Sequence, residues 1–164
     1  MFAIASIDLD WGIGKDGDLL CHVKEDMQFF KDHTIGKTVI MGRKTLESLP
    51  GGRPLKDREN VVLTRDRSFS REGVTAVHSV EEVCELAKCR DCAVIGGGSV
   101  YEALMPYTDT VYLTLFEKKF GADTFFPKLD EQQWERSILG KGEKNGLKYT
   151  FYLFKKTQIK VETT

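Results

Sequence analysis

An acidic residue inside an apolar helical pattern is the first feature of this chain that could do chemistry. In the stretch GDLLCHVKEDMQFFK (17–31), the spacing i, i+3, i+4, i+7 of one buried helix face is occupied by Val23, Asp26, Met27 and Phe30. A carboxylate that points inward needs a partner, so Asp26 is a candidate for binding or catalysis. The alternative is an acid in the first turn of a helix, where the helix dipole favours it.

Glycine and basic residues follow three apolar runs, and this pattern points to phosphate. The run 38–41 is followed by Gly42-Arg43-Lys44-Thr45, the run 93–95 by Gly96-Gly97-Gly98-Ser99, and the run 61–64 by Arg65. Backbone N–H groups at a helix N-terminus bind anions, and glycine lets the backbone approach the ligand. One such site alone is better explained by a tight turn or a surface charge. Three of them at the ends of predicted strands favour an anion site at one edge of a sheet.

The kind of cofactor is indicated by the motifs around these glycines. Neither Gly12–Gly14 nor Gly96–Gly98 forms the G-x-G-x-x-G fingerprint, so a nucleotide would be held by a different arrangement. Arg43, Lys44 and Arg65 supply more positive charge than a simple dinucleotide site needs. This surplus indicates an extra phosphate, and therefore NADP rather than NAD.

Three cysteines have a spacing that is known from iron–sulfur ligation. Cys84, Cys89 and Cys92 follow C-x4-C-x2-C. The pattern needs a fourth cysteine downstream, and the chain has none there, because Cys21 lies far upstream. We therefore expect buried or partly buried free thiols and no metal site. The three histidines show no ligand spacing and are interpreted as surface or loop residues.

Eight strands are predicted from apolar runs that are rich in β-branched residues. The first five are expected at 2–7, 38–41, 61–64, 74–77 and 93–96. Several of these lack polar alternation, which is typical of parallel strands covered on both faces. The last three are expected at 110–116, 134–139 and 147–154, with Asn145-Gly146 as a hairpin turn between the final two.

Helices are predicted between the strands. Besides the helix of Asp26, we expect one over 43–49, one that begins at Ser79 with Glu82 as its capping box, and one over 99–105. The predicted fold class is α/β: a single domain with a mixed, mostly parallel eight-stranded sheet, flanking helices and a C-terminal antiparallel hairpin. We expect the domain to span residues 1–157 and a polar tail to follow at 158–164.

Composition narrows the range of partners. The 164 residues carry 24 Lys and Arg against 25 Asp and Glu, a net charge of −1, which lacks the electrostatic footprint of a nucleic-acid binder. No apolar run approaches the length of a membrane span, and the first residues lack the basic start of a signal peptide. We expect a cytoplasmic, monomeric enzyme or binding domain with no nucleic-acid or membrane partner.

A series of motifs in a fixed order resembles a known family. The motifs are A-x-I-D, G-I-G-K-D-G-D-L, E-D-M-x-F-F-K, T-V-I-M-G-R-K-T-x-E-S-L, G-R-P-L, N-V-V-L-T-R, V-I-G-G-G-S-V-Y-E and A-D-T-F-F-P. Each is modest by itself, but their joint order and spacing, from residue 2 to about 156, resemble dihydrofolate reductase. The resemblance implies hydride transfer from NADPH to 7,8-dihydrofolate, which yields tetrahydrofolate.

The resemblance also implies a set of substrate-binding residues. Asp26 matches the only ionisable side chain of the pterin pocket, where N3 and the 2-amino group of the pterin partner it. Arg58, which could by itself be a loop charge, would hold the glutamate α-carboxylate in a bidentate manner. The full implied set is Ile4, Ser6, Asp26, Met27, Phe30, Leu49, Leu55, Arg58, Ile95 and Thr114. The same pocket would take diaminopyrimidines and other antifolate inhibitors.

The resemblance implies three groups of residues for NADPH. The phosphates and ribose would lie on Gly42, Arg43, Lys44 and Thr45 and on Gly96, Gly97, Gly98, Ser99, Val100 and Tyr101. The adenosine side would lie on Leu63, Thr64 and Arg65. Ser6 and the mobile-loop residues Ile13, Gly14 and Leu19 would lie by the nicotinamide. The family also has a cis peptide bond between the glycines that match Gly96 and Gly97.

The chain departs from the family before the helix of Asp26. Leu20-Cys21 stands where the family usually has Pro-Trp, and Lys24 replaces a common proline. In the family this tryptophan packs beside the substrate and helps to hold an ordered water. The departure therefore bears on the turnover rate, loop closure and antifolate affinity.

Two alternative functions stay open from sequence. The first is the reductase domain of riboflavin synthesis, which resembles this fold and also uses NADPH but does not require Asp26 with Arg58. The second is a non-catalytic folate- or nucleotide-binding protein, with Cys21 as a mark of lost activity.

Overall fold

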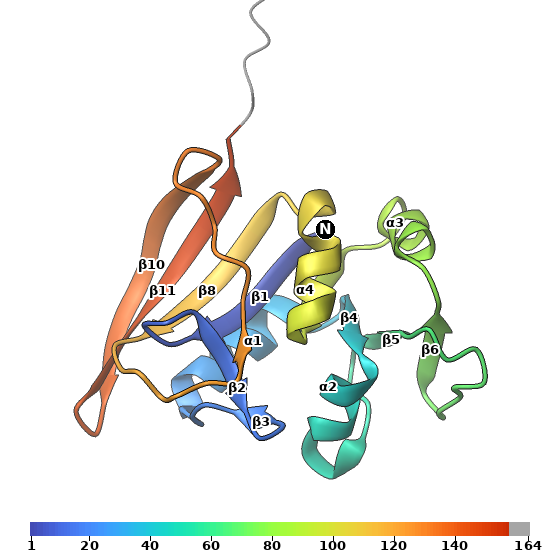
Figure 1. The fold of residues 1–164 in the computed structure, drawn as a ribbon, viewed down its shortest axis with the longest axis horizontal. Helices are drawn as coiled ribbons and strands as arrows, with labels where there is room; N and C mark the ends of the chain where they lie inside the picture. Colours follow the sequence, from blue (N-terminus) through green and yellow to red (C-terminus); the bar gives the residue numbers. More distant parts are fainter. Residues whose placement is uncertain (158–164) are drawn as a thin grey trace, which may run out of the picture.

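One eight-stranded sheet forms the framework of the molecule (Figure 1). The structure is a computed structural model that describes residues 1–157, so the predicted polar tail at 158–164 lies outside the described residues. The strands of the sheet lie in the order β10-β11-β8-β1-β7-β4-β5-β6. Their bounds are β1 Phe2–Ile7, β4 Thr38–Gly42, β5 Glu59–Leu63, β6 Val74–Val77, β7 Cys92–Gly96, β8 Thr110–Phe116, β10 Trp134–Lys144 and β11 Leu147–Lys156.

The direction of the strands confirms the predicted fold class. Six strands run parallel to one another: β8, β1, β7, β4, β5 and β6. β11 pairs antiparallel with both β8 and β10. Asn145 (φ 50°) and Gly146 (φ 82°) both have positive φ and close the hairpin, as predicted. The predicted strand 134–139 was too short, because glycines and charges hide the continuation of β10 beyond a bulge at Ile138 and Gly140.

Helices cover both faces of the sheet, which explains the missing polar alternation. They are α1 Lys24–Thr34, α2 Arg43–Ser48, α3 Val80–Ala87 and α4 Gly98–Leu104, with 3₁₀ turns η1 Pro50–Gly52 and η2 Met105–Tyr107. Alternate strand residues enter two apolar clusters, so that Ala3 packs with α3 and α4 while Phe2 and Ile4 pack with α1 and α2. Figure 1 shows α4 in front of the sheet and α1 behind it.

The capping box of α3 is confirmed. Ser79 Oγ accepts a hydrogen bond from the backbone N–H of Glu82, at 3.2 Å. The Glu82 carboxylate accepts one in return from the backbone N–H of His78, at 2.7 Å. The return bond reaches one residue further out than the standard motif.

The prediction that α1 buries Val23, Asp26, Met27 and Phe30 was partly wrong. Val23 is buried at the N-cap, but Met27 is 56% exposed. The helix packs instead through Phe29 and Phe30 on the sheet and through the buried Thr34. The aromatic side chains in the second half of the helix reach the sheet and leave Met27 on open surface.

A small second sheet was missed from sequence. It has the order β3-β2-β9 and consists of β2 Gly12–Lys15, β3 Asp18–Leu19 and β9 Thr124–Phe125. These strands are two to four residues long and carry no apolar run. They form because β2 pairs with a segment more than 100 residues away, as Gly12 does with Phe125.

The four cysteines are free thiols, and Cys89 is exposed rather than partly buried as predicted. The described residues contain no group of three or more His, Cys, Asp or Glu side chains that could hold a metal ion. No helix of residues 1–157 combines the length and the apolar character that crossing a membrane requires.

A buried carboxylate holds the small sheet on the large one. Asp8, which is 0% exposed, follows β1 directly. Its Oδ1 accepts hydrogen bonds from the backbone N–H groups of Asp10 (2.9 Å) and Gly12 (2.8 Å), and its Oδ2 accepts one from Phe120 (3.1 Å). The turn between β1 and β2 is thereby joined to the segment after β8.

Replacing Asp8 by Ala should lower the free energy of unfolding by about 2–4 kcal/mol, because three backbone donors lose a charged acceptor. Denaturant unfolding followed by circular dichroism measures this. Asp10→Ala is the matched control: its exposed carboxylate lies 3.6 Å from Lys119, and its loss should change stability by less than about 0.5 kcal/mol. Equal effects of the two substitutions would contradict the role given to Asp8.

Candidate active site

Asp26 is held at the ends of two neighbouring strands. It lies in the first turn of α1, and its Oδ2 accepts a hydrogen bond of 2.5 Å from the Ser6 hydroxyl of β1. Ser6 pairs in the sheet with Thr114 of β8, which is 1% exposed. The carboxylate therefore faces the sheet and not the solvent, as the helical pattern predicted.

The electrostatic setting of Asp26 favours a ligand with N–H donors. Burial raises the pKa of this carboxyl from its ordinary value, while the hydrogen bonds from Ser6 and Thr114 act in the opposite direction. None of the ion pairs found among residues 1–157 includes Asp26. A half-buried acid without a cation can still accept hydrogen bonds from a bound molecule.

An apolar wall extends from Asp26 along the α1 side of the sheet. One cluster contains the predicted substrate residues Ile4, Phe30, Leu49, Leu55 and Ile95. They come from β1, α1, the ends of α2 and β7, and the loop before β5. The fold therefore brings these side chains together from positions more than 90 residues apart in the sequence.

Arg58 is fixed at the far end of this wall. Its Nε donates to the carbonyl of Lys56 (2.9 Å), and its Nη1 donates to Thr34 Oγ1 (3.1 Å). Thr34 in turn donates to the carbonyl of Phe30 (2.8 Å), so the guanidinium is tied to α1. Burial lowers the pKa of Arg58, but a guanidinium stays charged in proteins. An oriented cation of this kind suits a carboxylate.

The two glycine turns meet at the carboxyl ends of β4 and β7. These strands are parallel neighbours, and Gly42 and Gly97 are the N-caps of α2 and α4. Neither helix has a side-chain cap, so their first N–H groups are not used by side chains of the caps. A Cβ atom on Gly96 would lie 3.3 Å from Thr45 Oγ1, and its φ of +136° favours glycine. The Gly96–Gly97 peptide is cis, as the resemblance implied.

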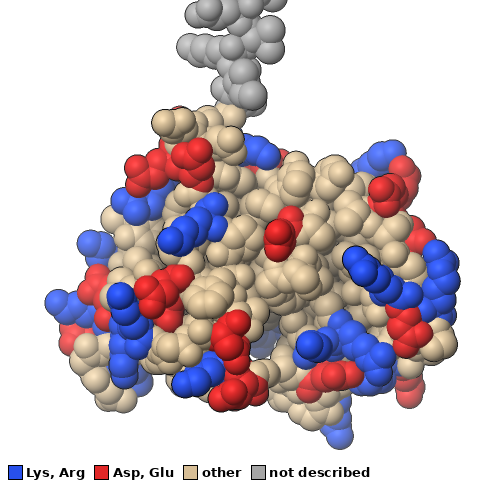
Figure 2. All heavy atoms as spheres, viewed as in Figure 1, with Lys and Arg blue, Asp and Glu red and all other residues tan. Residues whose placement is uncertain are grey.

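Basic side chains continue this edge beyond β5. Arg43 Nε donates to Glu47 (3.1 Å), and its Nη1 donates to Asp66 (3.3 Å), one residue after Arg65. These bonds bring α2 and the end of β5 together and place Arg43 near Arg65. Figure 2 shows Lys and Arg side chains gathered around α2, mixed with acidic ones, beside a notch in the surface between the β2–β3 hairpin and α2.

His78 lies at this edge directly after β6, in a loop as predicted, and is half-buried. Its Nδ1–H donates a hydrogen bond to the carbonyl of Thr64, at 2.8 Å, so the ring lies beside the predicted adenosine side. This position was not predicted from sequence. Its place directly after an apolar run, like that of Arg65, was the signal that could have found it.

The remaining predicted cofactor residues differ in exposure. Lys44, Leu19 and Ser99 are exposed, whereas Val100 and Tyr101 are buried. The Tyr101 hydroxyl donates to the carbonyl of Ile4 at 2.7 Å, beneath the site. Burial raises the pKa of Tyr101 strongly, so it remains a hydrogen-bond donor.

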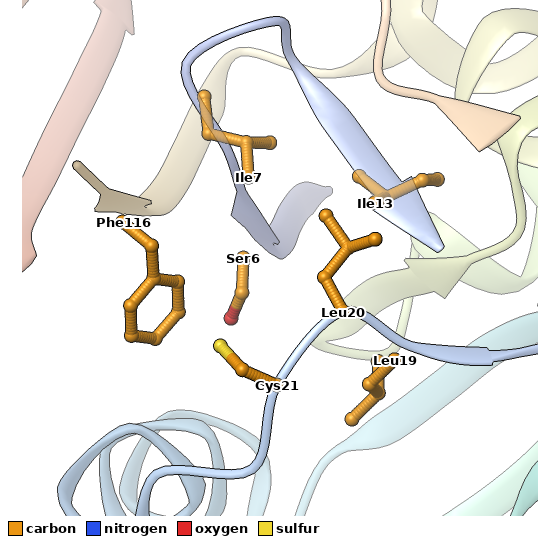
Figure 3. A pocket seen from close by; sticks show the side chains of 7 residues that line it. All are labelled: Ser6, Ile7, Ile13, Leu19, Leu20, Cys21 and Phe116. Carbon is orange, nitrogen blue, oxygen red and sulfur yellow. The ribbon is translucent and has the colours of Figure 1, made fainter. Parts of the chain in front are cut away.

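The β2–β3 hairpin, which contains the residues of the predicted mobile loop, lies over the end of β1. The backbone N–H of Asp16 donates to Asp123 Oδ2 at 2.9 Å and holds the β2–β3 hairpin near β9. Below the hairpin lies a cavity of about 20 Å³, lined by Ser6, Ile7, Ile13, Leu19, Leu20, Cys21 and Phe116 (Figure 3). The Cys21 thiol points toward the Ser6 hydroxyl in this cavity.

The fold and the site define the class of this protein. The chain is a small α/β protein with a ligand site at the carboxyl ends of parallel strands, one inward carboxylate, and a phosphate-compatible edge of glycines and arginines.

Comparison with known proteins gives the family. The family model described as dihydrofolate reductase matches residues 1–156. The dihydrofolate reductase of Bacillus subtilis (strain 168) is 39% identical over 157 residues, 93% of this chain and 92% of that protein. That of Staphylococcus aureus is 41% identical over 147 residues, 88% and 90% of the two chains. The structure of dihydrofolate reductase from Enterococcus faecalis complexed with NADP(H) and RAB-propyl has a TM-score of 0.86 and 36% identity, and the similarity covers 96% of both chains.

The chain belongs to the dihydrofolate reductase family. The family resemblance stated from the motifs is thereby confirmed. The same family name in all of these comparisons also favours it over the reductase domain of riboflavin synthesis.

Cys21 should resist alkylation at neutral pH. Burial, with the negative charge of Asp26 as a second cause, raises the pKa of its thiol to about 11, and the thiolate is the reactive form. In an iodoacetamide time course followed by mass spectrometry, Cys89 should be modified first, because it is exposed. The rate at Cys21 should rise about tenfold per pH unit between pH 7 and 9. Equal rates at Cys21 and Cys89 at pH 7 would contradict this environment.

Proposed function

We propose that Asp26 is the catalytic carboxylate of this chain and that the wall between Asp26 and Arg58 binds the substrate. As a member of its family, the chain reduces 7,8-dihydrofolate to 5,6,7,8-tetrahydrofolate by hydride transfer from NADPH. This reaction supports one-carbon metabolism and thymidylate synthesis. The observation that carries the proposal is an inward carboxylate without a cation, at one end of an apolar wall that ends in a fixed guanidinium.

The substrate would lie along this wall with a charged side chain at each of its two polar ends. Its pterin N3 and 2-amino group would donate to the Asp26 carboxylate, with Ile4, Phe30, Ile95 and Thr114 around the ring. Leu49 and Leu55 would flank the aminobenzoyl ring, and Arg58 would hold the glutamate α-carboxylate. Met27, exposed on α1, would become covered by the ligand. Diaminopyrimidine antifolates would present a similar pair of N–H donors to Asp26.

The edge of glycines and arginines fits NADPH. The uncapped starts of α2 and α4 would offer backbone N–H groups to phosphate, from Gly42 to Thr45 and from Gly96 to Val100. The N–H of Tyr101 donates to the carbonyl of Gly97 at 2.9 Å, so this residue would only lie beside the cofactor. Arg43 and Arg65 would bind the 2′-phosphate, with Leu63 and Thr64 on the adenosine. Ser6, Ile13, Gly14 and Leu19 would lie by the nicotinamide, which supplies the hydride when it is bound.

Asp26 would act on the substrate through position and charge. Hydride arrives at C6 of the pterin, and a proton must reach N5, at the edge away from N3 and the 2-amino group. Asp26 therefore does not hand a proton to N5 directly. It fixes the orientation of the ring, and its negative charge makes N5 more basic, so that water can supply the proton.

We also propose that the chain acts as a cytoplasmic monomer with small molecules as its partners. A net charge of −1 gives no support for nucleic acid as a partner. Following NADPH oxidation by absorbance, with and without dihydrofolate, tests the activity, and light scattering of the same sample tests the monomer.

Replacing Asp26 by Asn keeps the shape and removes the charge. Hydride transfer at pH 7 should fall roughly 10²–10⁴-fold, the usual scale of acid–base assistance. The loss should shrink as the pH falls, because dihydrofolate that is protonated in solution needs no help from the carboxylate. Single-turnover rates across pH measure this, with Glu25→Gln in the same helical turn as the control. Near-native rates of Asp26→Asn at pH 7 would exclude Asp26 as the catalytic group.

The stability of the same variant separates misfolding from lost chemistry. Because the folded-state pKa of Asp26 is raised, the ionised form is disfavoured in the folded protein, and this penalty exists above that pKa and disappears as the pH falls. Asp26→Asn should therefore unfold at pH 7 with a free energy at least equal to that of the native chain.

Replacing Arg65 by Ala should weaken NADPH far more than NADH. The lost charged hydrogen bond to the 2′-phosphate corresponds to about 1–3 kcal/mol, and NADH lacks that phosphate. Dissociation constants from quenching of protein fluorescence measure both cofactors. Arg67→Ala, another exposed arginine of the same loop, is the control. Equal losses for NADPH and NADH would contradict the role of Arg65.

A further inference from the structure

Ser6 is a polar exception on an apolar strand face. Alternate residues of β1 face the α1 side of the sheet, and the first two of these, Phe2 and Ile4, are buried in the apolar cluster there. Ser6 is the third, and its hydroxyl points to Asp26. An unpartnered hydroxyl on this face would be costly, so the hydrogen bond to the carboxylate explains why the position is compatible with serine.

The Ser6 hydroxyl and the Asp26 carboxylate can be paired in one direction only. A hydroxyl bound to an ionised carboxylate must donate, and it gains most when the carboxylate is charged. The bond also uses one side of Oδ2, which limits rotation of the carboxylate about its own axis. A carboxylate offers about four acceptor positions, so others remain for the N–H donors of a ligand.

Few other groups act on this carboxylate. Glu25 is its neighbour on α1, and the Cys21 thiol lies before the helix. Burial raises the pKa of Tyr149 of β11, and the negative charges of Glu25 and Asp26 raise it further, so this side chain also faces the carboxylate. Lys118 acts on Cys21 from the segment after β8. The groups that β1 and β8 direct to Asp26 are the uncharged hydroxyls of Ser6 and Thr114.

We propose that Ser6 is a positioning residue of the proposed reaction: its side-chain hydroxyl keeps Asp26 ionised and oriented for the N–H donors of the substrate. The effect of Ser6 on the substrate rests on the proposed function, whereas the hydrogen bond between Ser6 and Asp26 does not. Burial alone would move the titration of Asp26 upward, and the donated hydrogen bond opposes this shift. The donated hydrogen bond therefore favours the charged carboxylate that the site needs, and Thr114 acts in the same direction.

The test is the titration of Asp26 in variants of Ser6. Carbon-13 labelled aspartate and NMR follow the Asp26 carboxyl across pH in the ligand-free protein, and its signal is assigned by its loss in Asp26→Asn. Ser6→Ala should move the titration to higher pH, and Ser6→Thr, which keeps the hydroxyl, should restore it. Ser137→Ala, an exposed serine of β10, should leave it unchanged. If Ser6→Ala does not fold, Ser6→Cys keeps the size with a weaker donor and should move the titration in the same direction.

Binding of dihydrofolate across pH gives the functional consequence. In Ser6→Ala the affinity should begin to fall at a higher pH than in the native chain as the solution is acidified, because the carboxylate protonates earlier. An Asp26 titration that is the same in the native chain and in Ser6→Ala would overturn the proposal. A native chain that fails to bind dihydrofolate, with the NMR shift still present, would instead overturn the proposed function and leave the Ser6–Asp26 coupling intact.

Discussion

The site depends on keeping one carboxylate away from water without giving it a cation. Burial disfavours the charge of Asp26, and two hydroxyls from adjacent parallel strands, Ser6 and Thr114, partly compensate. The compensation is incomplete, so the group keeps capacity to accept hydrogen bonds from a ligand. A lysine or arginine in the same place would stabilise the fold more and would occupy the binding site. The protein therefore keeps an unfavourable buried charge at the position that we propose for catalysis.

The sheet makes this arrangement possible because its central strands are parallel. Their carboxyl ends lie along one edge, so Ser6 of β1, Thr114 of β8, Gly96 of β7 and Gly42 of β4 meet there although they are far apart in sequence. Helix pairs on both faces remove water from the strands, and their ends leave the edge accessible. The carboxylate of Asp26 and the phosphate-compatible glycine turns are thus placed by the same geometric rule.

Leu20 and Cys21 line the cavity below the β2–β3 hairpin. A half-buried thiol with a raised pKa, and not an indole, faces the Ser6 hydroxyl across a cavity that can hold about one water molecule. The β2–β3 hairpin above it is held by backbone pairing with β9 and by Asp8 and Asp123. The contacts that hold this hairpin are thus backbone pairing and carboxylate-to-backbone hydrogen bonds.

The sequence by itself determined the eight strands, their class, the hairpin turn at Asn145-Gly146, the capping box of α3 and the inward direction of Asp26. These features follow from local spacing, from turn residues and from one strong family pattern. Only the tertiary structure decided that Met27 lies on open surface, that β2, β3 and β9 form a sheet, that the buried Asp8 is an acceptor and that the half-buried Ser6 is a donor. The physical reason is that these contacts join residues up to more than 100 positions apart, and a short strand or a single hydroxyl has no periodic signal. Burial and hydrogen-bond partners are properties of the packed molecule, so they become visible only when the chain has folded.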